Sequence, residues 1–198
     1  MTNTIICQVL CVTHVVDKYN MKYFQCLDLD WKPVSDKLKQ FVLDNKELVG
    51  YELSGWKSVP ITNYSYLIPD IAKMLKPLDV LPVRISFHIS YSTDNTIHKD
   101  ASIHECRRIL LPVMNCEHTT TKFYKSQKEP TLQYQSNGIA GYFGDIELEN
   151  CDLVAEYQLD RAITMRPKEL HAVYSSNDSF PRISCPIEVN KDLTHLLI

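Results

Sequence analysis

The sequence lacks any run of basic residues longer than two, and its 24 acidic residues outnumber its 21 basic ones, giving a formal net charge of −3. A protein that binds nucleic acid non-specifically usually carries a basic face or arm. The bulk charge therefore disfavours a nucleic-acid binder, although a sum over the chain leaves a local basic groove open.

Paired cysteine motifs and long apolar runs are also missing. The seven cysteines are scattered, their number is odd and no Cys-x-x-Cys pair occurs, so neither a disulfide framework nor a structural zinc site is indicated. No window approaches the roughly 20 apolar residues of a membrane span. The first residues lack the basic region of a signal peptide. We expect free thiols in a soluble cytoplasmic protein.

The composition that is present is that of a globular protein, with 44% hydrophobic and 23% charged residues over 198 positions. This length suits a single domain. We expect a mixed α/β N-terminal extension, residues 1–78, to pack on a β-rich core, residues 79–190. Within the extension, residues 5–16 and 22–29 are rich in β-branched and aromatic side chains and predict strands.

Two helices are predicted in the same N-terminal extension. The first follows Pro33, with Ser35 as its N-cap and an apolar face that extends to Leu48. The second is predicted to begin near Ser65 and to stop before Pro77.

From about residue 79 the pattern changes to short strands. Residues 83–89 alternate apolar and polar side chains, the period of a half-buried strand. Further strands are predicted at 108–114, 119–125, 142–148, 152–158, 162–165, 170–175 and 182–189. Many short strands separated by turns indicate a sandwich or barrel rather than βαβ units. The sequence therefore predicts a mostly β fold with N-terminal helices.

Three residues in this β-rich part have side chains that suit a metal ion. His98 and Asp100 are two positions apart, so in an extended segment they point to the same side. His171 lies in a later predicted strand, 71 residues after Asp100 (171 − 100). Two histidines and one carboxylate form the facial triad of non-haem iron oxygenases, which leaves other positions on the metal open.

Arg182 and Ser184 lie 11 and 13 residues after His171 (182 − 171 and 184 − 171). The same two-residue spacing puts their side chains on one side of a strand. A planar guanidinium grips a carboxylate through two hydrogen bonds, and a hydroxyl adds another donor. Because Ile183 and Cys185 alternate with them, Arg182 lies on the polar side of its strand, which faces either solvent or a ligand-holding interior.

His98-x-Asp100, the distal His171 and Arg182-x-Ser184 together resemble the motif set of the iron(II)/2-oxoglutarate-dependent oxygenase superfamily. The segment from Arg108 to Val113 is similar to a strand of its aspartyl/asparaginyl hydroxylase-like and small phage-type branches. The resemblance spans roughly residues 80–190 and implies a double-stranded β-helix, also called a jelly roll or cupin-like barrel.

The resemblance also implies roles for these residues. His98, Asp100 and His171 would bind Fe(II), Arg182 and Ser184 would hold the far carboxylate of 2-oxoglutarate, and Arg108 is a weaker candidate for binding this cosubstrate. The reaction would use O2 and would normally hydroxylate a substrate, here a peptide, a metabolite or a nucleobase. The loop predicted at 125–142 would lie near the barrel mouth.

Other readings of these residues stay open. Asn115, Thr121 and Tyr124 are further candidates for lining the site, and His104 is an alternative partner of His98 and Asp100 in a zinc site. A cupin-like metal- or ligand-binding protein without 2-oxoglutarate chemistry is the main alternative function. A structural or virion-associated β-sandwich with coincidental motifs is the third.

Overall fold

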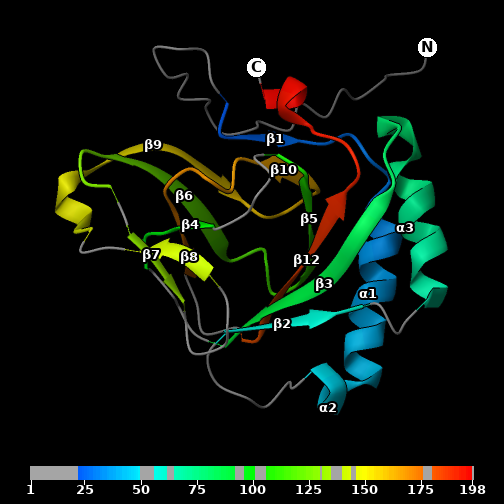
Figure 1. Cartoon of the computed structure of the whole chain (residues 1–198). Helices are drawn as coiled ribbons and strands as arrows, with labels where there is room; N and C mark the ends of the chain where they lie inside the picture. Colours follow the sequence, from blue (N-terminus) through cyan, green and yellow to red (C-terminus); the bar gives the residue numbers. More distant parts are fainter. Residues whose placement is uncertain are drawn as a thin grey trace, which may run out of the picture.

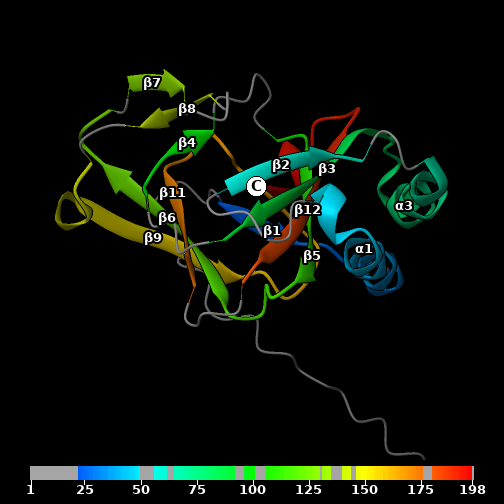
Figure 2. The ribbon, with the colours of Figure 1, turned by 90° about the horizontal axis from the view of Figure 1, so that it is seen from below.

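The computed structural model describes residues 22–49, 56–61, 65–91, 96–100, 106–129, 131–134, 140–143, 146–175 and 180–197. The strand predicted at 5–16 lies outside these residues. The described part forms three layers, in which helices cover one sheet and that sheet faces a second group of strands (Figure 1, Figure 2). None of the helices described there is long and apolar enough to cross a membrane.

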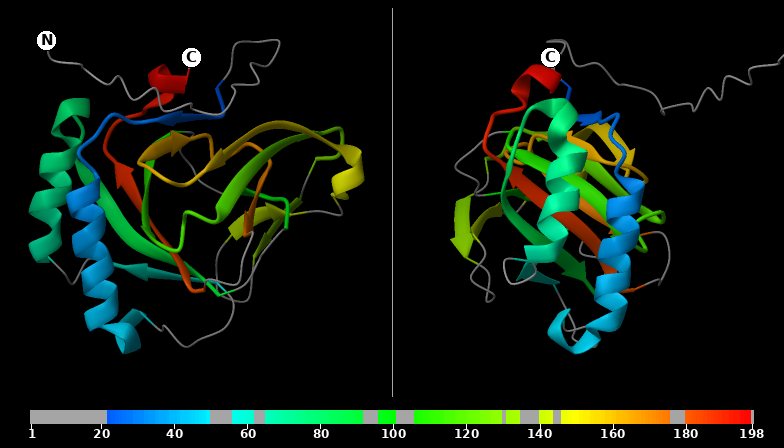
Figure 3. Two further views of the ribbon diagram at one scale, coloured as in Figure 1. Left: turned by 180° about the vertical axis from the view of Figure 1, so that it is seen from behind. Right: turned by 90° about the vertical axis from the view of Figure 1, so that its right-hand side faces the viewer.

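The helical layer consists of α1 and α3, which lie side by side against the sheet (Figure 3). Its elements are α1 (Lys32–Asp44), α2 (Lys46–Val49), η1 (Ser65–Leu67), α3 (Ile68–Leu75) and η2 (Lys76–Leu78). Both predicted helices are confirmed, but the first breaks at Asn45, so that Leu48 belongs to α2. Past the second helix, the chain continues through Pro77 as a 3₁₀ turn.

The prediction that Ser35 is the N-cap of the first helix was wrong. The helix already begins at Lys32, with Pro33 in its first turn, where a proline needs no N–H donor. The buried Ser35 hydroxyl donates instead to the backbone oxygen of Pro112, at 2.5 Å. The Ser35 hydroxyl therefore contacts a distant strand, although the local sequence pattern predicted that it caps the helix.

The sheet beneath the helices has six strands and is antiparallel in each pairing. In spatial order they are β1 (Phe24–Cys26), β10 (Ile163–Met165), β5 (Arg108–Met114), β12 (Arg182–Val189), β3 (Pro82–Ser90) and β2 (Trp56–Pro60). The two edge strands come from the N-terminal extension and the inner four from the predicted core. Residues far apart in the sequence thus share one sheet.

The facing strands form two three-stranded groups. One has the order β11 (His171–Ser175), β6 (Thr119–Ser126), β9 (Cys151–Gln158), and the other β4 (Lys99–Asp100), β8 (Ala140–Phe143), β7 (Thr131–Tyr134). A bridge between His98 and His171 joins the groups beside β4 and β11. The chain also forms the short 3₁₀ helices η3 (Leu148–Asn150) and η4 (Thr194–Leu197).

The order of the strands defines the architecture. If β3, β4, β5, β6, β9, β10, β11 and β12 are numbered from one to eight, the helix-covered sheet contains the order 6-3-8-1. The facing layer, joined at the His98–His171 bridge, has the order 2-7-4-5. Two antiparallel sheets with this alternation form a jelly roll. β7 and β8 are an extra hairpin inserted between the fourth and fifth of these strands.

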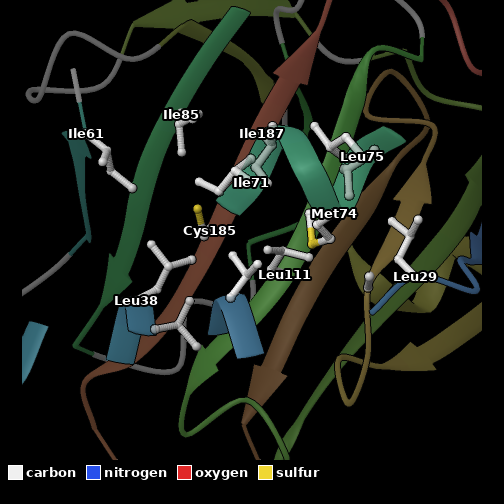
Figure 4. Close-up of a cluster of buried hydrophobic side chains, with 14 of the residues drawn as sticks. Leu29, Leu38, Ile61, Ile71, Met74, Leu75, Ile85, Leu111, Cys185 and Ile187 are labelled. Carbon is white, nitrogen blue, oxygen red and sulfur yellow. The ribbon is translucent and has the colours of Figure 1, made fainter. Parts of the chain in front are cut away.

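Two apolar clusters hold the layers together. The larger one lies between the helices and the outer face of the six-stranded sheet, where Leu38 and Ile71 meet Leu111, Cys185 and Ile187 (Figure 4). These five side chains are fully buried. Burying apolar surface contributes about 25 cal/mol of free energy per Å². This burial is what holds the helices against the sheet.

The second cluster lies inside the barrel. It contains Leu110 and Ile163 from the six-stranded sheet together with Phe123 and Tyr157 from the facing strands. Because its side chains come from both layers, this cluster fills one part of the barrel interior. The polar residues described below occupy another part.

Most predicted strands are confirmed within one or two residues, including 108–114 and 182–189, which match β5 and β12. The strand predicted at 142–148 was wrong in its second half, because residues 148–150 form η3. The segment 125–142 is not a plain loop, since it contains β7 and part of β8. The prediction at 22–29 shrinks to β1.

Candidate metal centre

His98, Asp100 and His171 come together where the two groups of facing strands meet. Backbone hydrogen bonds run both ways between the histidines, from His98 N to His171 O at 2.9 Å and from His171 N to His98 O at 2.8 Å. Asp100 follows two residues after His98 on β4, and its own N–H donates to Pro167 O at 2.9 Å. One potential ligand atom from each of the three side chains lies within 4.8 Å of the other two.

The two imidazole rings are oriented by backbone carbonyls. His98 Nδ1 lies 2.9 Å from Thr96 O, and His171 Nδ1 lies 2.8 Å from Glu169 O. A carbonyl only accepts hydrogen bonds, so each Nδ1 carries the proton and donates it. The lone pair of each ring is therefore on Nε2, which is the arrangement found in metal-binding histidines whose other nitrogen is held by a second group.

The electrostatic surroundings keep His171 and Asp100 in their ligand forms. Burial, with a smaller contribution from the neighbouring His98, lowers the pKa of His171 to about 4, so His171 is neutral at pH 7. Burial alone would raise the pKa of Asp100, but the charges of Arg108, His171 and His98 outweigh it and lower that pKa to about 2. Neutral imidazole and ionised carboxylate are the forms that bind a metal.

Arg182 points into the barrel, which decides the question that the sequence left open. Its Nε donates to Thr119 Oγ1 at 3.1 Å, and Thr119 belongs to β6 on the facing layer. Arg182 is 7% exposed and Thr119 is 1% exposed. Among the residues that the structure describes, Thr119 is the one hydrogen-bond partner of the Arg182 side chain. The guanidinium of Arg182 therefore lies in the interior of the barrel.

Ser184 lies on the same inner face as Arg182. It is 2% exposed and pairs with His88 on β3 and with Pro112 on β5. The alternate residues Ile183 and Cys185 face the helices. The strand β12 therefore directs polar side chains into the barrel and apolar side chains toward the helices.

Arg108 meets a metal-ligand candidate directly. Its Nη1 donates to Asp100 Oδ2 at 2.5 Å, and both side chains are only partly exposed, at 19% and 25%. The sequence suggested Arg108 as a cosubstrate-binding residue. The structure places it on the carboxylate of the triad, so a direct role toward the cosubstrate stays a prediction.

The further candidates for lining the site do not share one face of the barrel. Thr121 is buried on the inner face, opposite Val173 and Tyr157. Tyr124 packs in an apolar cluster on the other face and donates to the Tyr174 hydroxyl at 2.8 Å. Asn115 lies in the turn after β5 with a positive φ of 54°, and its side-chain amide donates a hydrogen bond to Pro181 O. His104, the alternative partner in a zinc site, lies outside the described residues.

Sequence reasoning missed three interior groups, His88, Thr119 and Tyr157. Burial lowers the pKa of His88 to about 3, with Arg108 and Arg182 contributing in the same direction. Burial likewise raises the pKa of Tyr157 to about 12. Asp100 and Arg182 act electrostatically on both residues. The alternation of residues along their strands indicated which side chains share a face. It did not indicate which face lies inside the barrel.

Comparisons with known proteins give a structural match only. No protein-family model and no curated protein matches the sequence. One similar solved structure is the non-haem α-ketoglutarate-dependent epimerase SnoN from nogalamycin biosynthesis, with a TM-score of 0.51 and 14% identity over 88% of this chain and 81% of that one. The fold is a double-stranded β-helix. SnoN in complex with Fe³⁺, α-ketoglutarate and nogalamycin RO is also similar, with a TM-score of 0.48 and 12% identity over the same shares.

Proposed function

We propose that this chain is an iron(II)- and 2-oxoglutarate-dependent dioxygenase, and that it hydroxylates its substrate. The observation that carries the proposal is the convergence of His98, Asp100 and His171, whose ligand atoms lie within 4.8 Å of one another. Imidazole and carboxylate ligands in this number are those of non-haem iron oxygenases. The similarity in fold to SnoN, named as an α-ketoglutarate-dependent epimerase, adds support at the level of the scaffold.

The residues present fit the proposed metal. Each histidine directs an Nε2 lone pair away from a carbonyl-bound Nδ1, and Asp100 is ionised. No thiol belongs to this three-residue cluster, and thiolate is the ligand that would favour zinc or an iron–sulfur cluster instead. His98 Nε2, His171 Nε2 and one oxygen of Asp100 would hold the ion.

The other interior groups fit the cosubstrate. 2-Oxoglutarate carries a carboxylate at each end, and the buried guanidinium of Arg182 suits the end remote from the metal. The Nε of Arg182 donates a hydrogen bond to Thr119 Oγ1, which restrains the plane of the guanidinium. Ser184, two residues along the same face, would add a hydroxyl donor.

Iron, 2-oxoglutarate and O2 together supply the oxidising power needed to convert an unactivated C–H bond into an alcohol. The chain itself supplies position and shelter. The paired histidine strands fix the triad, the guanidinium of Arg182 orients the cosubstrate, and the aromatic rings of Phe123 and Tyr157 close part of the interior to water. The proposed substrate is a peptide, a metabolite or a nucleobase.

The setting proposed for this chemistry is the cytoplasm. Cys26, Cys106, Cys116, Cys151 and Cys185 are free thiols among the described residues. Reduced thiols and ferrous iron both persist in a reducing compartment.

The proposal is tested by adding Fe(II) and 2-oxoglutarate to the purified protein without oxygen and recording the visible metal-to-ligand charge-transfer band. Wild type should give the band, His171→Ala should lose it, and Arg182→Ala should need more 2-oxoglutarate to reach it. A folded, iron-loaded wild type without a band would reject the oxygenase and leave a cupin-like metal-binding protein. A wild type that binds no metal would make the triad coincidental. With the band established, mass spectrometry of converted substrates distinguishes hydroxylation from epimerisation.

A further inference from the structure

The two oxygens of Asp100 face different partners. Oδ1 lies 3.7 Å from Nε2 of His98, the atom whose lone pair is directed into the triad. Oδ2 accepts a hydrogen bond from Nη1 of Arg108 at 2.5 Å. One oxygen therefore belongs to the metal cluster and the other to an arginine.

Arg108 is itself held by the sheet. It lies at the start of β5, pairs with Glu188 of β12, and its backbone oxygen accepts a hydrogen bond from Thr164 Oγ1 at 3.0 Å. Its side chain is 19% exposed, so the pair with Asp100 is largely shielded from solvent. These contacts fix the backbone of Arg108, and a charge-assisted hydrogen bond from its guanidinium restrains the rotation of the Asp100 carboxylate.

This restraint matters for a metal that must keep positions open. The triad leaves sites for the cosubstrate and for oxygen. If Asp100 bound through both oxygens, it would occupy one of those sites. Arg108 occupies Oδ2 and leaves Oδ1 for the ion.

We propose that Arg108 is a positioning residue of the metal centre, which orients Asp100 and restricts it to one oxygen toward the metal. The inference rests on the proposed metal site and assigns Arg108 a role different from direct binding of the cosubstrate. Groups that orient metal ligands typically contribute about 10- to 100-fold to metal affinity or activity. The effect should therefore be visible in metal binding alone, without substrate or turnover.

The experiment titrates the protein with Mn(II) and follows the loss of the electron paramagnetic resonance signal of the free ion. Arg108→Met should weaken Mn(II) binding by about 10- to 100-fold. Arg108→Lys, which keeps a donor and a charge but not the planar geometry, should recover part of that loss. Arg84→Met is the matched control, because Arg84 is exposed on β3 and pairs with the same Glu188, two strands from Arg108. It should change binding less than twofold.

Each other outcome overturns the inference. Unchanged Mn(II) affinity in a folded Arg108→Met protein would show that the ion pair does not position the ligand. Tighter binding would show that Arg108 competes with the metal for Asp100. A wild type that binds no Mn(II) would remove the proposed metal site together with the inference, whereas the first two results would leave that site intact.

A crystal structure of the Mn(II)-loaded wild type tests the coordination directly. The expected result is one Asp100 oxygen on the metal and the other on Arg108. Both oxygens on the metal would overturn the single-oxygen assignment even if the affinity change were found.

Discussion

The two faces of β12 differ in what they contact and in what they do. On the outer face, Ile183, Cys185 and Ile187 are fully buried against the helices. On the inner face, Arg182 and Ser184 are almost as buried but lie among polar groups, with Thr119 across the barrel. Burial alone therefore does not separate scaffold from site in this fold. The chemical character of the layer that each residue faces does separate them. Substitutions at neighbouring residues of β12 should therefore affect different properties, stability on the outer face and ligand binding on the inner face.

The largest expected effect on stability comes from the outer face. Ile183→Ala leaves a cavity in the core between helices and sheet, and such truncations cost about 2–5 kcal/mol of unfolding free energy. Urea denaturation measures this loss. The folded fraction should still bind Mn(II) with wild-type affinity, because Ile183 does not contact the triad. A loss of metal binding equal to that of His171→Ala would show that the two faces are not independent.

A smaller effect is expected from the inner face. Thr119→Val keeps the shape of the side chain but removes the oxygen that accepts from Arg182 Nε at 3.1 Å. A hydrogen bond of this kind contributes about 1 kcal/mol, so the affinity for 2-oxoglutarate should fall about 3- to 10-fold. Titration of the charge-transfer band in the iron-loaded protein measures it.

The control for this substitution is Thr120→Val. Thr120 is the next residue of β6 and its side chain points to the opposite face. It should leave the 2-oxoglutarate affinity unchanged. Equal effects of the two substitutions would mean that the hydrogen bond to Arg182 does not orient the guanidinium.

The difference between the faces also explains what the sequence could and could not predict. β5 and β12 were predicted with their observed bounds because both are dense in β-branched and aliphatic residues. β4 has only two residues, Lys99 and Asp100, and exists through its pairing with Tyr142 and Gly141 of β8. No local pattern encodes a strand that a distant hairpin defines.

The candidate site was predictable to a similar degree. The spacing of His98, Asp100 and His171 suggested a ligand set, and the structure brings these side chains together. The direction of Arg182 was not predictable, because both faces of its strand are covered and alternation alone does not say which cover is the interior. The contact of Arg108 with Asp100 depends on how β4 lies over β5, which is a tertiary property.

The smallest effect expected concerns His88, a half-buried histidine on the inner face of β3. The pKa of His88 is lowered to about 3, chiefly by burial, so below pH 6.5 the unfolded chain takes up a proton that the folded chain does not. The unfolded state then binds more protons, and the unfolding free energy must fall as the pH falls from 6.5 toward 3. Between pH 6.5 and 5.5 this one group accounts for at most about 1 kcal/mol.

Urea denaturation at these two pH values, compared between wild type and His88→Gln, isolates the contribution of His88. Glutamine does not titrate, so the variant should lose less stability on acidification than wild type, whatever its stability at pH 6.5. His118→Gln serves as the control for replacing a histidine by glutamine, because the side chain of His118 is 47% exposed. If His88→Gln and wild type lost stability equally, His88 would be accepting a proton inside the folded barrel. The inner face around Arg182 would then tolerate a further positive charge, contrary to the lowered pKa of His88.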